Sequence, residues 1–158
     1  MVDKDNIKQT VKEKFTEYLT EKGLRKTQER FAILDYIYSS EGHFDMEMLY
    51  ESMSRQHFRV SRATIYNTIE LLLNCHLVLK HQFGKNTSHY EKNYNSDNHY
   101  HSICTECGMV QEIKDTGIRE IIQSEKMKKF RMTHYCLYMY GICTNCENAK
   151  KSKNNNNV

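Results

Sequence analysis

Hydrophobic residues recur every three or four positions through residues 7–75, the spacing that places them on one face of a helix. The first run ends near Gly23, and further helices are predicted to begin at the N-cap Thr27, at Asp45 and at Ser61. The side chains expected to face the core are Ile7, Val11, Phe15, Tyr18, Leu19, Phe31, Leu34, Ile37, Tyr38, Met46, Leu49, Tyr50, Met53, Ile65, Ile69 and Leu72. The pattern predicts a compact helical unit with short connections.

The pattern changes in residues 77–92, LVLKHQFGKNTSHYEK, which predict two short strands around a turn at residues 84–86. Helices followed by a hairpin are typical of a winged helix-turn-helix, in which the recognition helix, here residues 61–74, enters the major groove of DNA. An amphipathic core helix with a polar outer face explains the same segment equally well. Both interpretations stay open at this level.

Candidate DNA contacts lie at the start of the predicted recognition helix, in SRATIYNT. Its polar side chains suit bonds to bases or phosphates, and its tyrosine suits contact with a thymine methyl group. These candidates are Arg62, Thr64, Tyr66 and Asn67. No acidic residue occurs between Glu51 and Glu70, a stretch that also carries Arg55 and Arg59, so it is either a phosphate-facing patch or a solvated face.

The second half predicts a different architecture, with short strands and one helix. Strands are expected at residues 99–104, 109–113 and 130–142, with a helix at about 115–128. The last residues, KKSKNNNNV, are polar and low in complexity and predict a disordered tail. The predicted α+β chain comprises a winged-helix domain over residues 1–88, a hinge over 89–92, a small α/β domain over 93–148 and a tail over 149–158.

Length and charge limit the classes of protein. At 158 residues the chain has room for two small domains, and a domain of about 60 residues buries little core, so another stabilising device is expected. No apolar run approaches the roughly 18 residues of a membrane span, and the start, MVDKDNIKQTVKEKF, lacks a signal-peptide core. We therefore expect a soluble cytoplasmic protein without a membrane partner. The net charge of +3 is too small to indicate nucleic acid by itself.

Two CxxC pairs, Cys104–Cys107 and Cys143–Cys146, predict a metal site. Two such turns supply four thiolates, the ligand set of a closed structural zinc site, which would stabilise a small domain. A redox dithiol, iron–sulfur ligation and a disulfide framework are the alternatives. Cys75 and Cys136 lie outside the pairs and are expected to be packed thiols.

His99 and His101 project from the same face of a predicted strand. Together with Glu91 and Glu112 they offer nitrogen and oxygen ligands for a divalent metal ion. Polar residues on an exposed edge strand would show the same spacing, so the residues alone do not decide between the two interpretations.

Several segments between residues 23 and 146 occur in an order that identifies a family. They are GLRKTQER, GHFDMEMLY, SRATIYNTIELL, HYEK, HYHSICTECG and THYCLYMYGICTNC. Through them the chain resembles the ferric uptake regulator (Fur) family. The resemblance implies a homodimeric, metal-activated repressor of double-stranded DNA operators, with an N-terminal winged helix and a C-terminal α/β dimerisation domain.

The resemblance also assigns roles to individual residues. Cys104, Cys107, Cys143 and Cys146 match the structural zinc ligands. The regulatory metal ligands are matched by His43, Glu91, His99, His101 and Glu112. Tyr66 matches a tyrosine that contacts bases, and Arg25 matches a basic residue placed in the minor groove.

One metal site of many relatives is predicted to be absent or degraded. Its ligand positions correspond here to Asn98, Tyr100, Arg119 and Tyr135, which are poor ligands or none. Glu120 and His134 each lie one residue away, so a local shift of the site to them is the alternative.

The expected function is a repressor that senses Fe²⁺ and controls iron-uptake genes, with Mn²⁺ or Zn²⁺ as alternative regulatory ions. A metal joining His43 to the later ligands would set the angle between the two domains. Peroxide-sensing relatives use aspartate at the position of Glu91, which makes that function less expected than iron sensing, while zinc sensing stays open. A zinc-stapled interaction module is the alternative of another class. An enzyme is not expected: the chain has no proline, which the zinc deaminase signature requires, and no HExxH.

Overall fold

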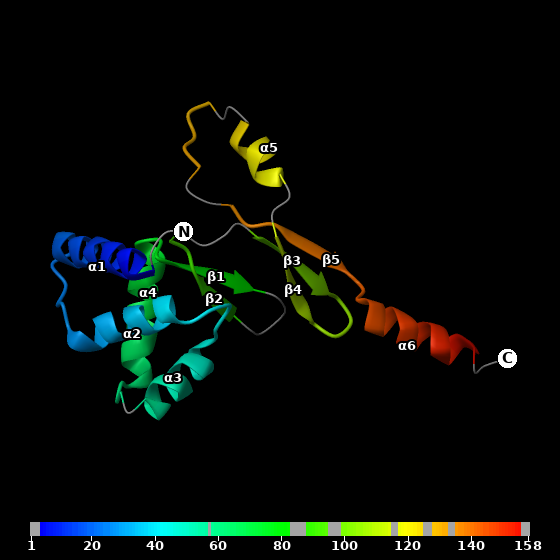
Figure 1. Cartoon of the computed structure of the whole chain (residues 1–158), viewed down its shortest axis with the longest axis horizontal. Coiled ribbons are helices and arrows are strands. Elements are labelled where there is room, and N and C mark those ends of the chain that lie inside the picture. Colours follow the sequence, from blue (N-terminus) through cyan, green and yellow to red (C-terminus); the bar gives the residue numbers. More distant parts are fainter. Residues whose placement is uncertain are drawn as a thin grey trace. The chain divides into compact units, whose positions relative to one another are not determined.

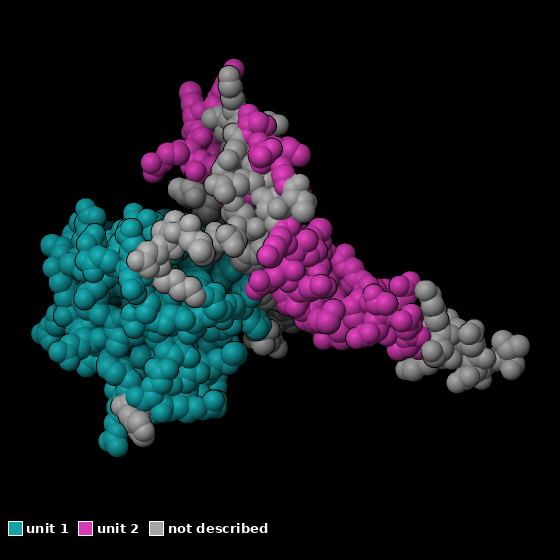
Figure 2. All heavy atoms as spheres, in the orientation of Figure 1, with its two compact units in different colours: residues 1–96 teal, residues 97–158 magenta. Residues whose placement is uncertain are grey.

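The computed structural model describes most of the chain as two compact units, Met1–Ser96 and Asp97–Val158 (Figures 1 and 2). The described residues are 4–56, 58–82, 88–94, 99–114, 117–124, 128–132 and 135–155. No helix within these ranges is long and apolar enough to cross a membrane.

Unit 1 begins with the helices that the hydrophobic spacing predicts. They are α1 (Lys4–Glu21), α2 (Gln28–Ser39), α3 (Met46–Arg55) and α4 (Arg62–Asn74). The Asp45 carboxylate accepts a hydrogen bond from the Met48 N–H at 2.7 Å, and the Ser61 hydroxyl accepts one from the Thr64 N–H at 3.0 Å. Each bond satisfies a backbone donor that the helix itself leaves unpaired. Thr27 stands at the N-cap of α2 but makes no such side-chain bond.

The core of unit 1 matches the predicted inward faces closely. Phe15, Leu19 and Leu72 have no measurable exposure or nearly none, and the other predicted core side chains are buried or half-buried. Ile33 is fully buried although it was not among the predicted core positions. It neighbours Leu34 on a helix whose core-facing surface is wider than one narrow stripe.

A hairpin follows α4 and is joined to the helical segments by several hydrogen bonds, of which two connections bear on the site. Strands β1 (Val78–Gln82) and β2 (Ser88–Lys92) pair antiparallel. The Tyr38 hydroxyl donates a buried hydrogen bond of 2.7 Å to the Leu77 carbonyl oxygen. Phe44 and Tyr90 exchange both backbone hydrogen bonds, at 2.9 and 2.7 Å. The second connection fixes the segment before α3 beside β2, which brings residues 43 and 91 together.

Unit 2 contains a three-stranded sheet in the order β4–β3–β5. Its elements are β3 (His99–Cys104), β4 (Val110–Lys114), α5 (Ile118–Ser124), β5 (Tyr138–Gly141) and α6 (Thr144–Asn155). Strand β3 pairs antiparallel with β4 and parallel with β5. Gly108, with φ of +73°, lies in the β3–β4 turn, where a positive φ suits glycine.

Two predicted elements of unit 2 differ from those observed. Within the described residues, the predicted strand over residues 130–142 is a strand only at Tyr138–Gly141, the residues that pair with the last four residues of β3. The predicted helix over about 115–128 is observed at Ile118–Ser124, among the described residues of that range. Residues 149–155 of the predicted tail continue α6, which begins inside the second cysteine pair and is held there by the bond from the Glu147 N–H to the Cys143 carbonyl oxygen.

Candidate metal centres and nucleic-acid interface

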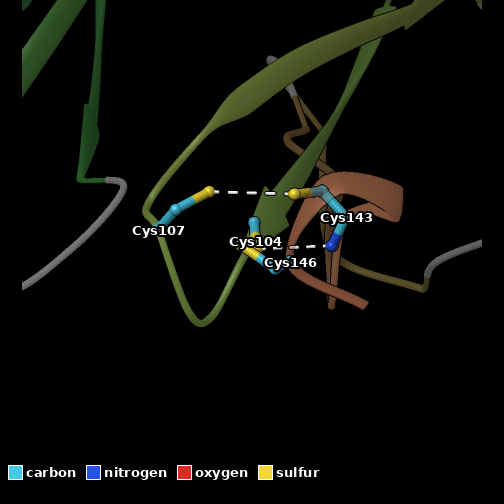
Figure 3. A group of neighbouring side chains, drawn as sticks. All are labelled: Cys104, Cys107, Cys143 and Cys146. Atoms are coloured by element: carbon cyan, nitrogen blue, oxygen red, sulfur yellow. Dashed lines mark hydrogen bonds between the residues drawn. The ribbon is translucent and has the colours of Figure 1, made fainter. Parts of the chain in front are cut away.

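Four cysteines of unit 2 converge at one end of its sheet (Figure 3). Cys104 ends β3, Cys107 lies in the turn before β4, and Cys143 and Cys146 lie at the start of α6. The four sulfur atoms all lie within 4.8 Å of one another. The Cys143 N–H also donates to the Cys104 sulfur at 3.3 Å. The predicted CxxC pairs therefore come together as one cluster.

The geometry of this cluster suits a tetrahedral zinc ion better than a disulfide. The Cys107 and Cys143 sulfurs are 3.8 Å apart, almost twice the S–S bond length of about 2.05 Å. Zinc–sulfur bonds of about 2.3 Å in a tetrahedron separate neighbouring sulfurs by roughly 3.8 Å. All four thiols are free in the structure. Four soft ligands at this spacing would hold Zn²⁺ with no open position for a substrate.

The thiols of the cluster differ in acidity when no ion balances their charge. Hydrogen bonds from the backbone N–H groups of Cys107 and then Cys143 lower the pKa of Cys104 to about 6. Hydrogen bonds with Cys143 and then Cys107 raise the pKa of Cys146 to about 12. Four adjacent thiolates repel one another, so a bound cation is what allows all four to ionise together.

A second group of potential ligands lies inside unit 1, around the Glu91 carboxylate. His43 comes from the segment between α2 and α3, His81 from β1 and Glu91 from β2. The distance from His43 Nε2 to Glu91 Oε2 is 3.3 Å, and that from His81 Nε2 to Glu91 Oε1 is 2.7 Å. Their ligand atoms lie within 4.8 Å of one another. Two imidazoles and a carboxylate form a set that binds divalent transition metals.

The surroundings of this group are largely dry. His81 is 1% exposed and Glu91 is 8% exposed, while the His43 side chain is 15% exposed. A buried carboxylate is costly unless it has polar partners, and here one imidazole nitrogen lies beside each of its oxygens. The rings of His43 and His81 meet edge to face, with centroids 5.5 Å apart. The geometry gives each carboxylate oxygen its own nitrogen partner.

Unit 2 carries the remaining predicted regulatory ligands on β3 and β4. His101 is buried and stands directly opposite Glu112 in the antiparallel register, which puts both side chains on one face of the sheet. Glu112 is exposed, and the His101 ring lies 5.8 Å from that of Tyr138. The His99 side chain falls outside the described residues, although its backbone pairs with Lys114.

The residues at the positions of the predicted absent site are only partly described. Tyr100 is buried, Tyr135 is half-buried and Glu120 is exposed. Asn98, His134 and the side chain of Arg119 lie outside the described residues. The absence of this site stays a prediction.

His81 is the member of the unit 1 group that is not among the residues predicted from the sequence. The signal was present in the predicted hairpin, because a turn near residues 84–86 pairs His81 with His89. Glu91, two residues beyond His89, then shares the face of His81. A histidine and a glutamate that are diagonal neighbours on paired strands can be predicted from the strand register, but not from their separation in the sequence.

The predicted DNA contacts lie on the outer side of α4. Its inner face is buried, whereas Arg62, Asn67 and Tyr66 are exposed, Tyr66 by 53%. Thr64 is half-buried and shares a hydrogen bond of 2.8 Å with the Ser61 hydroxyl. Arg25 is exposed in the connection between α1 and α2. The helix thus presents a polar surface at its N-terminal half.

Arg62 is held by two partners from α3. Its guanidinium bonds to both carboxylate oxygens of Glu47 and lies over the Tyr50 ring, 4.1 Å from the centroid. These contacts tie the exposed guanidinium to α3 through one carboxylate and one aromatic ring.

Comparison with known proteins agrees with this architecture. The model of the ferric uptake regulator family matches residues 21–140. The peroxide-responsive repressor PerR of Staphylococcus aureus (strain Mu50 / ATCC 700699) is 32% identical over 130 residues, which cover 82% of this chain and 86% of that protein.

Two solved structures are similar in fold. The ferric uptake regulator of Pseudomonas aeruginosa with manganese is 25% identical, with a TM-score of 0.68 over 82% of this chain and 97% of that one. The ferric uptake regulator of Francisella tularensis with iron is 25% identical, with a TM-score of 0.57 over 79% and 96%. The winged helix-turn-helix followed by an α/β domain is confirmed, and the chain belongs to the ferric uptake regulator family.

Proposed function

We propose that the chain is a metal-responsive transcriptional repressor that binds operator DNA as a homodimer, senses Fe²⁺ and controls iron-uptake genes. The observation that carries the proposal is the group formed by His43 and Glu91 inside the winged-helix unit. Ligands for a divalent ion within a DNA-binding unit give that ion a direct means of changing how the unit binds DNA.

DNA recognition is assigned to α4. In the major groove, Arg62, Thr64, Tyr66 and Asn67 would supply polar and apolar contacts to bases and phosphates. Arg62 would then exchange Glu47 for the DNA, and Arg25 would enter the minor groove. In a homodimer the two copies of α4 must be spaced by one turn of DNA, about 34 Å.

The regulatory ion would join the two units. His43 and Glu91 belong to unit 1, and His99, His101 and Glu112 belong to unit 2. Coordination by both sets would restrict the angle between the units and thereby the spacing of the recognition helices. Metal binding and operator binding are then linked, and a coupling of about 3 kcal/mol changes DNA affinity on the order of 100-fold.

The cysteine cluster has a separate, structural role in this scheme. Zn²⁺ held by its four thiolates would join the β3–β4 turn to the start of α6. Unit 2 is small, and its sheet has only three strands in the described residues, so the metal supplies stability that apolar burial does not.

Fe²⁺ is proposed as the regulatory ion because imidazole and carboxylate ligands suit it, and the Francisella relative carries iron. The Pseudomonas relative carries manganese, and the order of intrinsic affinities favours Zn²⁺, so all three ions must be compared. Peroxide sensing is the second candidate, favoured by the name of the Staphylococcus relative. Its sign would be Fe²⁺-dependent oxidation of His43 or His99.

Metal analysis of anaerobically purified protein, paired with DNA-binding titrations, tests the proposal. Operator duplexes would be selected from a random library in the presence of Fe²⁺, Mn²⁺ or Zn²⁺. We expect one zinc per chain that resists dialysis, and salt-sensitive DNA binding that requires a second ion. Protein that binds no duplex with any of these ions would instead be a zinc-stapled interaction module. Mass spectrometry after peroxide treatment of the Fe²⁺ form decides between iron and peroxide sensing.

A further inference from the structure

We infer that His81 is a metal ligand, so that unit 1 by itself holds a two-imidazole, one-carboxylate site for a divalent transition-metal ion. The inference rests on the proposed function, because it adds a ligand to the proposed regulatory site. It also assigns the metal-binding role to a residue of the β1–β2 hairpin.

The hairpin register fixes His81 in position. His81 pairs with His89 across the two strands, and Glu91 lies two residues further along β2 on the same face. The 2.7 Å separation of His81 Nε2 and Glu91 Oε1 is the shorter of the two imidazole–carboxylate distances in the group. With 1% exposure the His81 ring has no freedom to turn into solvent.

Two imidazole nitrogens face the Glu91 carboxylate from different segments of the chain. His43 Nε2 faces Glu91 Oε2, while His81 Nε2 faces Glu91 Oε1. Because all three ligand atoms lie within 4.8 Å of one another, an ion at this point would replace both imidazole–carboxylate contacts by coordinate bonds without moving a strand.

A further imidazole ligand affects which ion the site prefers and what the bound ion does. Nitrogen-rich sites favour Zn²⁺, Co²⁺ and Ni²⁺ over Mn²⁺. The site in unit 1 would also retain an ion when the ligands of unit 2 are removed, so that metal binding and metal response become separable properties.

Counting coordinated histidines tests the inference directly. The probe is Co²⁺ added anaerobically to full-length protein whose cysteine cluster is filled with Zn²⁺. Each imidazole bound to Co²⁺ gives one strongly shifted, exchangeable ring N–H signal in the proton NMR spectrum. His81→Gln is the informative variant, because glutamine keeps a hydrogen-bond donor for Glu91 but binds these ions poorly. His89→Gln is the matched control from the same hairpin.

We expect His81→Gln to lose one shifted signal and to bind Co²⁺ at least about tenfold more weakly, the scale of losses seen when the surroundings of a metal are altered. His89→Gln should keep all signals. An unchanged signal count in His81→Gln would overturn the inference and leave His81 as a residue that positions Glu91. Zinc content and circular dichroism report whether the variant is folded.

A second variant keeps the test independent of how His81→Gln folds. His99→Ala/His101→Ala should retain Co²⁺ with two shifted signals, those of His43 and His81. Failure of this variant to bind Co²⁺ would also overturn the inference. If the wild type shows metal-dependent DNA binding while His81→Gln keeps its signal count, only the inference fails. A wild type that binds Co²⁺ but never DNA refutes the proposed function instead.

Discussion

The two candidate metal centres of this chain are built in opposite ways. The cysteine cluster of unit 2 takes its ligands from two short turns, each of which brings two thiols together locally. The group around Glu91 takes His43 from the segment before α3, His81 from β1 and Glu91 from β2, which only the tertiary structure brings together. One centre can therefore be identified from spacing alone, whereas the other depends on the register of a hairpin and on a bridge between distant segments.

The difference in construction indicates a difference in role. A soft, four-thiolate cluster is complete and has no site for further ligands, which suits a permanent ion. A harder nitrogen and oxygen set with three members in unit 1 has an incomplete coordination sphere, which suits an ion that comes and goes and recruits further ligands. The first centre should govern folding, and the second should govern DNA binding.

Removal of one cysteine ligand is expected to have the largest effect. Cys104→Ala should lose zinc and unfold unit 2, because structural zinc contributes about 10–16 kcal/mol of binding free energy in small domains. Metal analysis, thermal unfolding and gel filtration would show loss of zinc and of the dimer. Cys136→Ala, which lies outside the cluster, is the control and should change neither. A stable, zinc-containing dimer in Cys104→Ala would break the distinction between the two centres.

Removal of the shared carboxylate should have a large effect that leaves the fold intact. Glu91→Gln should reduce the effect of Fe²⁺ on operator affinity from about 100-fold to nearly none, because it removes an anionic ligand while conserving volume. Zinc content and dimerisation should be those of the wild type. Fluorescence anisotropy with an operator duplex measures the response. His89→Gln is the control, and equal Fe²⁺ responses of Glu91→Gln and this control would contradict a regulatory role for Glu91.

The sequence predicts most of the fold but only part of the second centre. The helix starts at Asp45 and Ser61 can be predicted because a capping side chain bonds to a backbone group only three residues away. Each half of the cysteine cluster is likewise formed by residues that are close in the sequence. His81 was missed because its partner, Glu91, is ten positions away and is reached through the hairpin register. The extent of β5 depends likewise on pairing with β3, a strand that is distant in sequence.

A smaller effect is expected from the ion pair on α3 and α4. Glu47→Gln should strengthen DNA binding by about two- to fivefold, because it releases Arg62 for phosphates or bases without much loss of folding stability. Arg62→Ala should weaken binding and reduce the slope of log affinity against log salt concentration by about one. Titrations at several salt concentrations measure both variants. Weaker DNA binding in Glu47→Gln would show that Glu47 instead holds Arg62 in its binding position.

The smallest effect concerns a thiol that belongs to neither centre. Burial raises the pKa of Cys75 to about 11. This pKa lies above the ordinary value of 9.0, so the contribution of the neutral thiol to folding stability is fully present below pH 9. The contribution is lost as the pH rises through about 11. Alkylation of folded protein at pH 8 after zinc chelation should modify Cys104, Cys107, Cys143 and Cys146 well before Cys75. Equally fast labelling of Cys75 in mass spectra would contradict its burial as a neutral thiol.

We expect an ion in the second centre and operator DNA to stabilise each other's binding. Linkage requires that the operator increase metal affinity by the same factor by which the metal increases operator affinity. The most direct measurement is an anaerobic titration of the zinc-loaded dimer with Fe²⁺, with and without a saturating operator duplex. We expect the operator to tighten Fe²⁺ binding by about 100-fold. Identical Fe²⁺ affinity in the two titrations would contradict this linkage.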